Sequence, residues 1–383
     1  MTRGVVRPVF RRRNLLILLG LLHLYVGVRI LPDLPGGWGA RLAGALLLGL
    51  CYGLMAGGLY ARGARSSRLT QRLTVAGFLS AGLFSSWVVL TLLRDVALLV
   101  SYAWTAGSVA IRQGSAVAVV GLALLATAVG FANARRRARI VRVEVPLAQL
   151  PPALEGFSIA QISDVHVGRT IRRDYVAAIV GAVNALEPDM VAVTGDLVDG
   201  PVGELAPHTA PLASLRARHG VFFVTGNHEY YAGEHAWVRE LRRLGLRVLM
   251  NEHVVLEHAG AALVIAGVTD YSAHHFDPAQ RSDPAAAIAG APRGAPRILL
   301  AHQPRSAEAA ARAGFQLQLS GHTHGGQFWP WIWFVRLQQP FTAGLHRLND
   351  LWIYISRGTG YWGPPKRLGA PSEITLLRLV AAR

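Results

Sequence analysis

The stretch FQLQLSGHTHGG, residues 315–326, joins an apolar, strand-like run to a cluster of histidines and glycines. Four earlier motifs repeat this arrangement, since each places good metal ligands directly after an apolar run. They are Asp164-Val165-His166, Gly195-Asp196, Gly226-Asn227-His228-Glu229 and Ala301-His302. The carboxyl ends of neighbouring strands meet at one edge of an open α/β sheet, where such folds place their sites. The five motifs therefore predict an α/β fold with metal ligands gathered at one edge.

The motifs combine carboxylate, imidazole and amide oxygen, which together suit borderline divalent metals such as Mn, Fe, Co or Zn. Five motifs supply more ligands than one ion needs, so the sequence predicts a site for two ions. Two ions about 3.5–4 Å apart can activate a water and clamp the oxygens of an in-line displacement at phosphorus. Asp196 stands alone after Gly195 at a strand end, which suits a carboxylate that bridges the ions.

The segment from about Phe157 to Pro371 resembles the calcineurin-like metallophosphoesterases, and its ending GHTHGGQ is most similar to their bacterial, membrane-anchored branch. The resemblance implies an αββα sandwich and a metal-dependent phosphoric ester hydrolase with two divalent ions. Manganese is the first expectation, with iron, zinc or cobalt as alternatives. The implied ligands are Asp164, His166 and His324 for one ion, Asn227, His302 and His322 for the other, and Asp196 as the bridge. His228 is implied to be unligated, to orient the phosphate and to protonate the leaving group.

Other polar residues near the motifs receive supporting roles. Asp199 and Glu229 are expected to hold ligands by hydrogen bonding. Asp270 follows an apolar run and is expected either to support a loop near the site or to form a simple turn. The remaining nine histidines are interpreted as structural: His23, His208, His219, His235, His253, His258, His274, His275 and His346.

Four long apolar runs fill the first third of the chain, at about residues 15–31, 40–60, 73–102 and 115–132. Each is near or above the roughly 17–25 residues that cross a bilayer as a helix, and none has the polar face of a soluble amphipathic helix. Arg29 interrupts the first run only at its end, where its side chain can reach the headgroups. The sequence thus predicts an all-α transmembrane domain of four helices before the α/β sandwich. The expected boundaries are 1–134 for the membrane domain, 135–156 for a basic linker and first strand, and 157–383 for the metallophosphoesterase domain.

Most of the net charge of +17 lies in the first part of the chain. Residues 1–139 carry 17 arginines against Asp33 and Asp95, whereas residues 140–383 carry 22 basic and 20 acidic side chains. A high isoelectric point often indicates nucleic-acid binding, but the position of the charge argues against a nucleic-acid partner here. The single cysteine, Cys51, lies in the second apolar run, which excludes a disulfide within the chain and a cysteine metal site.

Arginines also predict the orientation of the runs, because they are enriched in cytoplasmic connections. Only Arg29, Arg41 and Arg112 flank the first and third connections. Thirteen others precede the first run, separate the second from the third, or follow the fourth: Arg3, Arg7, Arg11, Arg12, Arg13, Arg62, Arg65, Arg68, Arg72, Arg135, Arg136, Arg137 and Arg139. We therefore expect a multi-pass protein of the cell (inner) membrane, with both ends and the catalytic domain in the cytoplasm. Arg94 and Asp95 lie inside the third run and are functional candidates, since charges within membranes often are.

Periodicity predicts further elements around the motifs. Helices are expected at residues 175–186, 234–244 and 306–313, and strands at 140–145 and 374–379. The stretches Arg247–Leu256 and Ala261–Val268 are expected to form two strands of a second sheet. The aromatic segment Phe328–Val335 has two interpretations, a cover over the core or a lip at the membrane interface, where tryptophan is enriched. Arg336, Arg357, Lys366 and Arg367 are candidates to meet phosphates, or else solvated charges.

Three functions are consistent with this sequence. The first is a membrane-anchored phosphoesterase that hydrolyses a phosphodiester or pyrophosphate, plausibly lipid-linked, such as a UDP-diacylglucosamine-like substrate. The alternative is a phosphodiesterase that acts on soluble nucleotides or generic phosphodiesters. A second alternative is a transporter or sensor that the hydrolase domain regulates. The presence of His228 and of all the implied ligands argues against a metal-binding scaffold without turnover.

Overall fold

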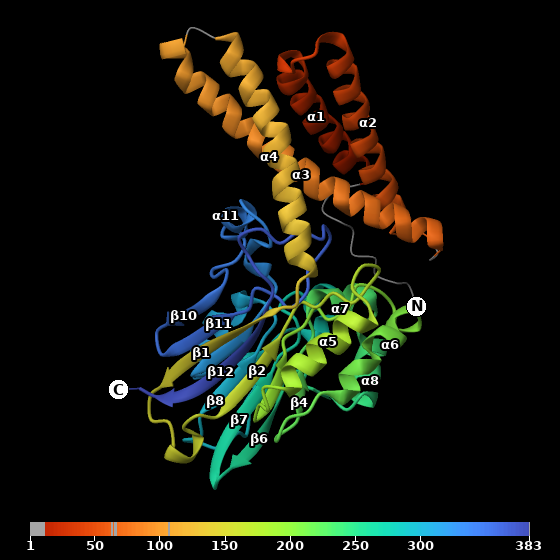
Figure 1. Ribbon diagram of the computed structural model, residues 1–383. Helices are drawn as coiled ribbons and strands as arrows, with labels where there is room; N and C mark the ends of the chain where they lie inside the picture. The colour runs from red at the N-terminus through yellow and green to blue at the C-terminus, as the bar shows by residue number, and fades with distance from the viewer. Residues whose placement is uncertain (1–11, 63, 65–66, 106–107, 383) are drawn as a thin grey trace. The chain divides into compact units, whose positions relative to one another are not determined.

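The structure is a computed structural model that describes residues 12–62, 64, 67–105 and 108–382 (Figure 1). The chain forms two compact units. The α/β unit contains Arg136–Trp362 and the chain from Gly369, and the helical unit contains the chain up to Arg135 together with Gly363–Leu368. Among the arginines used to predict orientation, Arg3, Arg7, Arg11 and Arg65 lie outside the described residues.

The α/β unit is built on two six-stranded sheets. The order of the first sheet is β1 (Arg139–Leu147), β12 (Glu373–Ala381), β2 (Ser158–Ile162), β3 (Met190–Val193), β4 (Val221–Phe223) and β5 (Arg247–Val248). The order of the second is β10 (Gly344–Leu348), β11 (Leu351–Ile355), β9 (Leu317–Ser320), β8 (Arg297–Leu300), β7 (Ala261–Gly267) and β6 (Glu252–His258). Strands β2 to β5 run parallel, as do β7, β8 and β9. Their carboxyl ends therefore lie at a common edge within each sheet.

The sheets pack face to face because successive side chains of a strand point to opposite faces. In β8, Ile298 and Leu300 join a core that also contains Ile159 of the first sheet. The intervening Leu299 points outward and packs with Ala307. The helices of this unit include α5 (Arg173–Asn184), α6 (Val202–Thr209), α7 (Asn227–Ala232), α8 (Glu234–Arg243) and α11 (Trp331–Val335), which are labelled in Figure 1. Two short helices, α9 (Pro284–Ala287) and α10 (Ala307–Arg312), accompany the second sheet. The predicted αββα sandwich is confirmed.

The expected helices at 175–186, 234–244 and 306–313 correspond to α5, α8 and α10, and the expected strands at 140–145 and 374–379 to β1 and β12. The interpretation of Arg247–Leu256 as one strand of a second sheet is wrong. Its first two residues pair with β4 at the edge of the first sheet, and only the chain from Glu252 pairs with β7 in the second. The chain turns between them at Asn251, whose φ of 58° is a left-handed conformation that asparagine tolerates.

The helical unit contains α1 (Arg12–Ile30), α2 (Gly37–Ala61), α3 (Arg68–Thr105) and α4 (Val109–Arg135), which coincide with the four predicted runs. All four are long and apolar enough to cross a membrane. Helices α2 and α3 approach closely at two glycines, since a Cβ atom on Gly77 would lie 2.8 Å from the carbonyl oxygen of Leu54 and 2.9 Å from the Cα of Gly58. Small residues commonly permit such crossings between membrane helices.

The two acidic side chains of this unit, Asp33 and Asp95, are both paired with arginines. The buried guanidinium of Arg94 donates to the carboxylate of Asp33, to the Arg29 carbonyl and to Ser115 Oγ. The adjacent Asp95 accepts instead from the Tyr25 hydroxyl, at 2.7 Å, and from the Arg29 guanidinium. Arg94 and Asp95 therefore join neighbouring helices by ion pairs, which accounts for two charges inside an apolar run.

The segment Gly363–Leu368 belongs to the helical unit although it is remote from it in sequence. The ammonium of Lys366 donates to the Gly82 carbonyl at 2.8 Å, to Ser86 Oγ and to Thr127 Oγ1. The backbone N–H of Arg367 donates to the Gly130 carbonyl. Lys366 and Arg367 are both fully buried, so the expectation that they meet phosphates or solvent is wrong. The Lys366 side chain can be buried here because hydroxyl and carbonyl oxygens accept hydrogen bonds from its ammonium group.

Candidate metal centre

All five motifs lie directly beyond the carboxyl ends of parallel strands. The first three follow β2, β3 and β4 of one sheet, and the last two follow β8 and β9 of the other. The structure brings together every residue of the implied ligand set that is a histidine or an aspartate. Together with His228, they form three overlapping groups: Asp164 with His166 and His324; His166 with Asp196 and His228; and Asp196 with His302 and His322.

The backbone at this edge is strained. The φ angles of Asp164, His166, Asp196, His322 and His324 lie between 50° and 71°, a left-handed conformation that costs a non-glycine residue of order 1–3 kcal/mol. Nearby glycines make room for the ligands. A Cβ atom on Gly226 would lie 2.2 Å from Asp196 Oδ1, and one on Gly321 would lie 2.1 Å from Asp164 Oδ2. The surrounding core must therefore hold these turns in place, and such strain typically accompanies function.

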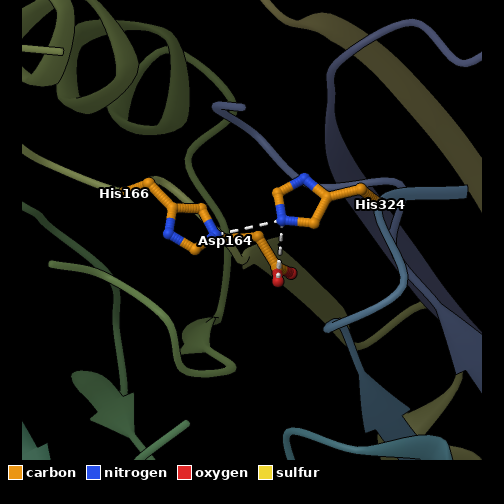
Figure 2. A group of neighbouring side chains, drawn as sticks. All are labelled: Asp164, His166 and His324. Carbon is orange, nitrogen blue, oxygen red and sulfur yellow. Dashed lines mark hydrogen bonds and ion pairs between the residues drawn. The ribbon is translucent and has the colours of Figure 1, made fainter. Parts of the chain in front are cut away.

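The first group presents three donor atoms to one point (Figure 2). The Nε2 atoms of His166 and His324 lie 3.0 Å apart, and His324 Nε2 is 3.5 Å from Asp164 Oδ1. All three residues are buried. His166 donates through Nδ1 to Asp199 Oδ1 at 2.8 Å, which leaves the lone pair of Nε2 directed at the group. This orientation is typical of a metal-binding histidine.

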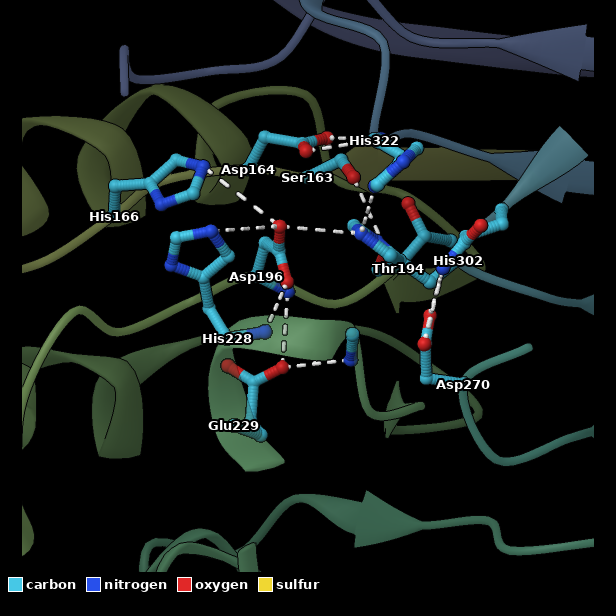
Figure 3. A network of polar contacts seen from close by, with 12 residues as sticks. Ser163, Asp164, His166, Thr194, Asp196, His228, Glu229, Asp270, His302 and His322 are labelled. Atoms are coloured by element: carbon cyan, nitrogen blue, oxygen red, sulfur yellow. Dashed lines mark hydrogen bonds and ion pairs between the residues drawn. The ribbon is translucent and has the colours of Figure 1, made fainter. Parts of the chain in front are cut away.

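Asp196 belongs both to the third group, with His302 and His322, and to the second group, with His166 and His228 (Figure 3). Asp196 Oδ2 is 3.2 Å from His302 Nε2 and 3.9 Å from His166 Nε2. His302 donates through Nδ1 to the Thr194 carbonyl, so its Nε2 also faces inward. Burial and the neighbouring His302 lower the pKa of His322 to about 3, which keeps its ring neutral as a metal ligand must be. Asp196 therefore lies between two sets of nitrogen donors, as a bridging carboxylate would.

Asn227 is the remaining residue of the implied ligand set. It is buried at the start of α7, and its Oδ1 atom has no hydrogen-bond partner among the described residues. A buried amide oxygen without a partner costs roughly 1–3 kcal/mol, and coordination to a cation would remove that cost. The donor chemistry and this oxygen both fit the two divalent ions that the fold family implies.

Three carboxylates support the donors, as the sequence predicts for Asp199 and Glu229. Asp199 Oδ1 accepts from both His166 and His228. The buried carboxylate of Glu229 accepts from the backbone N–H groups of Asp196, Leu197 and Gly226 (Figure 3), and so fixes the turns that carry Asp196 and Asn227. Asp270 accepts from Gln303, which follows His302 directly, and therefore supports that loop.

His228 lies at the open side of the centre, with 14% of its side chain exposed. It donates through Nδ1 to Asp199 at 2.7 Å, and its Nε2 is 3.9 Å from Asp196 Oδ2. Burial alone would lower the pKa of His228, but the carboxylates of Asp196 and Asp199 raise it to about 9. A ring that is protonated at neutral pH and directed toward the centre can deliver a proton, although its group with His166 and Asp196 also makes it a candidate ligand.

Two aromatic neighbours of His228 are not predicted from the sequence as site residues. Tyr231 and Trp362 present their rings at 5.3 Å and 6.0 Å from the imidazole, both nearly perpendicular to it. Gln327, the last residue of GHTHGGQ, holds Trp362 by exchanging two hydrogen bonds with its backbone. The only sequence signal for this contact is the position of Gln327 directly after the last ligand motif.

Comparison with known proteins identifies the domain. Residues 157–326 match the family model described as calcineurin-like phosphoesterase. A bovine "Transmembrane protein with metallophosphoesterase domain" is 39% identical over 302 residues, which cover 73% of this chain and 67% of that protein. An "Uncharacterized metallophosphoesterase" of Helicobacter pylori is 39% identical over 66% of each chain. One of Aquifex aeolicus is 33% identical over 63% of this chain and 91% of its own.

The chain spans about two thirds of the length of the bovine and Helicobacter relatives. The named relatives include bacterial ones, and the bovine one is a transmembrane protein by name, in agreement with the four apolar helices found here. The chain belongs to the calcineurin-like phosphoesterases, as a membrane protein with a metal-dependent phosphoester hydrolase domain.

Proposed function

We propose that the protein is a membrane-anchored phosphoesterase that uses two divalent ions, manganese first, to hydrolyse a phosphodiester or pyrophosphate of a membrane lipid. The observation that carries this proposal is the chain of three overlapping donor groups, in which the first two share His166 and the last two share Asp196. Asp164, His166 and His324 would hold one ion, and Asn227, His302 and His322 the other. The membrane domain would comprise residues 1–134, the linker and first strand 135–156, and the catalytic domain 157–383.

The chemistry divides between the ions and the protein. Bound divalent ions supply an activated water and neutralise charge on the phosphoryl oxygens. His228 would orient the phosphate and donate its Nε2 proton to the leaving oxygen. Asp199 would hold the ring for that transfer, since it accepts from Nδ1 at 2.7 Å. Positioned proton donors of this kind typically contribute about 10²–10⁴-fold to a rate.

An exposed aromatic surface supports a lipid substrate. We define the aromatic lip as Trp329, Trp331, Trp333 and Phe334, of which each is between 40% and 58% exposed. Rings with about half of their surface exposed cover the core only in part, which favours the interpretation of the segment as a lip. The lip adjoins the centre, because Gly326, two residues after His324, packs directly against Ile332 of α11. Arg336 stacks over Trp333 at 5.2 Å and adds a cation to the apolar surface. Aromatic rings with a nearby cation are typical of membrane–water interfaces.

Replacing Trp329, Trp331 and Trp333 together by serine is expected to raise KM for a lipid phosphodiester by about tenfold. Hydrolysis of a small soluble phosphodiester is expected to change by less than about twofold, since the metal ligands are untouched. Loss of roughly 1.4 kcal/mol of interfacial binding accounts for a tenfold change. The measurement is steady-state kinetics of purified protein in mixed micelles, with each candidate metal and a panel of lipid and nucleotide substrates.

Val255→Ser is the matched control, because Val255 is similarly exposed on β6 but lies outside the lip. It should leave both activities unchanged. Equal loss of both activities in the tryptophan variant would mean that the lip supports the fold rather than a lipid. A preference of the unmodified protein for a soluble nucleotide over every lipid would favour the alternative substrate class.

We also propose that the catalytic domain faces the cytoplasm, from the asymmetry of 13 arginines against three around the apolar runs. Reporter fusions after Arg139 are expected to fluoresce with a cytoplasmic reporter and to lack alkaline phosphatase activity. Fusions in the connection at Gly36 between α1 and α2 should behave in the opposite way. Alkaline phosphatase activity after Arg139 would contradict the orientation and would place the substrate outside the cell.

A further inference from the structure

Tyr231 lies beside the open side of the metal centre. It is four residues after Asn227 and three after His228 on α7, so its side chain neighbours both of theirs on the helix surface. Its ring centroid is 5.3 Å from that of His228, and the two rings are nearly perpendicular. Tyr231 is 65% exposed, whereas the adjacent Tyr230 is only 5% exposed. Tyr231 therefore reaches solvent at the place where a substrate would meet His228.

The hydroxyl group of Tyr231 lies near the donors of the metal centre. Burial of this group raises its pKa, as do the carboxylates of Asp196 and Asp270, whereas hydrogen bonding with the Asn227 side chain lowers it. A hydrogen bond lowers the pKa of a phenol when the phenol oxygen accepts it, so the amide N–H of Asn227 is the donor. This arrangement leaves Asn227 Oδ1 for an ion, and it leaves the hydroxyl proton of Tyr231 without an acceptor among the described residues.

The fold already uses the hydroxyl groups of other tyrosines near the ligand loops. Tyr230 donates to Gln280 Oε1 at 2.7 Å, and Tyr175 donates to the Thr359 carbonyl at 2.8 Å. Trp362, the other aromatic neighbour of His228, has no hydroxyl group. Tyr231 therefore adds an O–H donor beside His228 that the fold does not use.

We propose that Tyr231 is a further catalytic residue, whose hydroxyl group donates a hydrogen bond to a phosphoryl oxygen of the substrate beside His228. The inference rests on the proposed function, because it takes the reacting phosphate to lie between the ions and His228. Phosphoryl oxygens carry negative charge and accept strongly from O–H groups. Helix α7 also carries Asn227, so one helix would position both this donor and a ligand of the second ion. Tyr231 transfers no proton, which separates its role from that of His228.

Tyr231→Phe removes the hydroxyl group and keeps the ring beside His228. In manganese-loaded protein, the affinity for inorganic phosphate, measured by isothermal titration calorimetry, should fall about tenfold, as expected for the loss of a hydrogen bond to a charged acceptor. The value of kcat/KM should fall by a similar factor for a nitrophenyl and an alkyl phosphodiester, since both share the phosphoryl oxygen. The metal content and the Tm should not change.

Tyr230→Phe is the matched control at the neighbouring position. Its hydroxyl group is bonded within the fold, so this variant should lower the Tm and leave the phosphate affinity and kcat/KM unchanged. Equal phosphate affinity in the two variants would overturn the proposal. A lower metal content in Tyr231→Phe would also contradict it, because the residue would then act only by holding Asn227.

The two esters separate this role from proton donation. A loss in Tyr231→Phe that is larger for the alkyl ester than for the nitrophenyl ester would make Tyr231 a proton donor and would refute the contact with a phosphoryl oxygen. If the unmodified protein bound phosphate but hydrolysed neither ester, the proposed function would fail. The phosphate affinities of the two variants would still decide whether Tyr231 contacts the phosphate.

Discussion

Asp196→Asn is expected to reduce hydrolysis by on the order of 10³-fold or more and to lower the metal content from about two ions per chain. Asp196 Oδ2 faces nitrogen donors of both groups, at 3.2 Å from His302 and 3.9 Å from His166. His302 and His228 hold the pKa of Asp196 well below its usual range against the effect of burial, so it supplies a full negative charge. Asparagine keeps the shape but removes that charge, and a 10³-fold loss corresponds to about 4 kcal/mol.

The substitution is not expected to disturb the fold. The Oδ1 atom of Asp196 accepts from the backbone N–H of His228, and an asparagine oxygen can accept the same bond. The measurements are activity with saturating manganese and metal content by elemental analysis after gel filtration. Asp174→Asn, on the exposed first turn of α5, is the control for a lost carboxylate on the same unit. Two retained ions in Asp196→Asn would contradict the bridging role.

The site was predictable because its information is local. Each ligand follows an apolar run directly, so the rule for strand ends is enough to bring Asp164 and Asp196 to one edge of the first sheet. The packing of the two sheets adds His302 from the second. The motifs can be recognised without knowing which strand pairs with which. The same locality explains the helical unit, where long apolar runs identify α1 to α4 without any tertiary information.

Features that depend on partners distant in sequence were not predictable. Nothing near Arg247 indicates that β5 ends after two residues and that β6 then joins the other sheet, since both stretches alternate equally well. Lys366 illustrates the same limit. Its sequence context, GPPKRL, is typical of an exposed loop, and only the oxygens of Gly82, Ser86 and Thr127 explain its burial.

The β10–β11 hairpin, in contrast, had a usable signal that was missed. Asn349 and Asp350 connect its strands, and Asn349 has a φ of 54°. Asparagine in a two-residue connection between strand-like runs is typical of a hairpin turn. The helix α11 had no comparable signal, because its sequence WIWFV suits a strand, a helix or a loop.

His228→Asn is expected to lower the turnover rate by about 10²–10⁴-fold while both ions are retained. The imidazole lies at the open side of the centre and is oriented by Asp199, which is the arrangement of a proton donor. Leaving groups differ in how much they need that proton. A nitrophenolate leaves readily without one, whereas an alkoxide does not, so the loss should be largest for alkyl esters.

The decisive experiment therefore makes two measurements on the same His228→Asn protein, the rates on the two esters and the metal content. His228 also groups with His166 and Asp196, and a ligand role would predict a lower metal content with equal losses for both leaving groups. A proton-donor role predicts two ions per chain, nearly unchanged KM, and a loss for the alkyl ester at least tenfold greater than for the nitrophenyl ester. His235→Asn, at an exposed histidine on α8, controls for the loss of an imidazole. Because Asp199 accepts hydrogen bonds from both His166 and His228, the metal content must be measured together with the kinetics. Two retained ions, with a larger loss of activity on the alkyl ester than on the nitrophenyl ester, would assign protonation of the leaving group to His228.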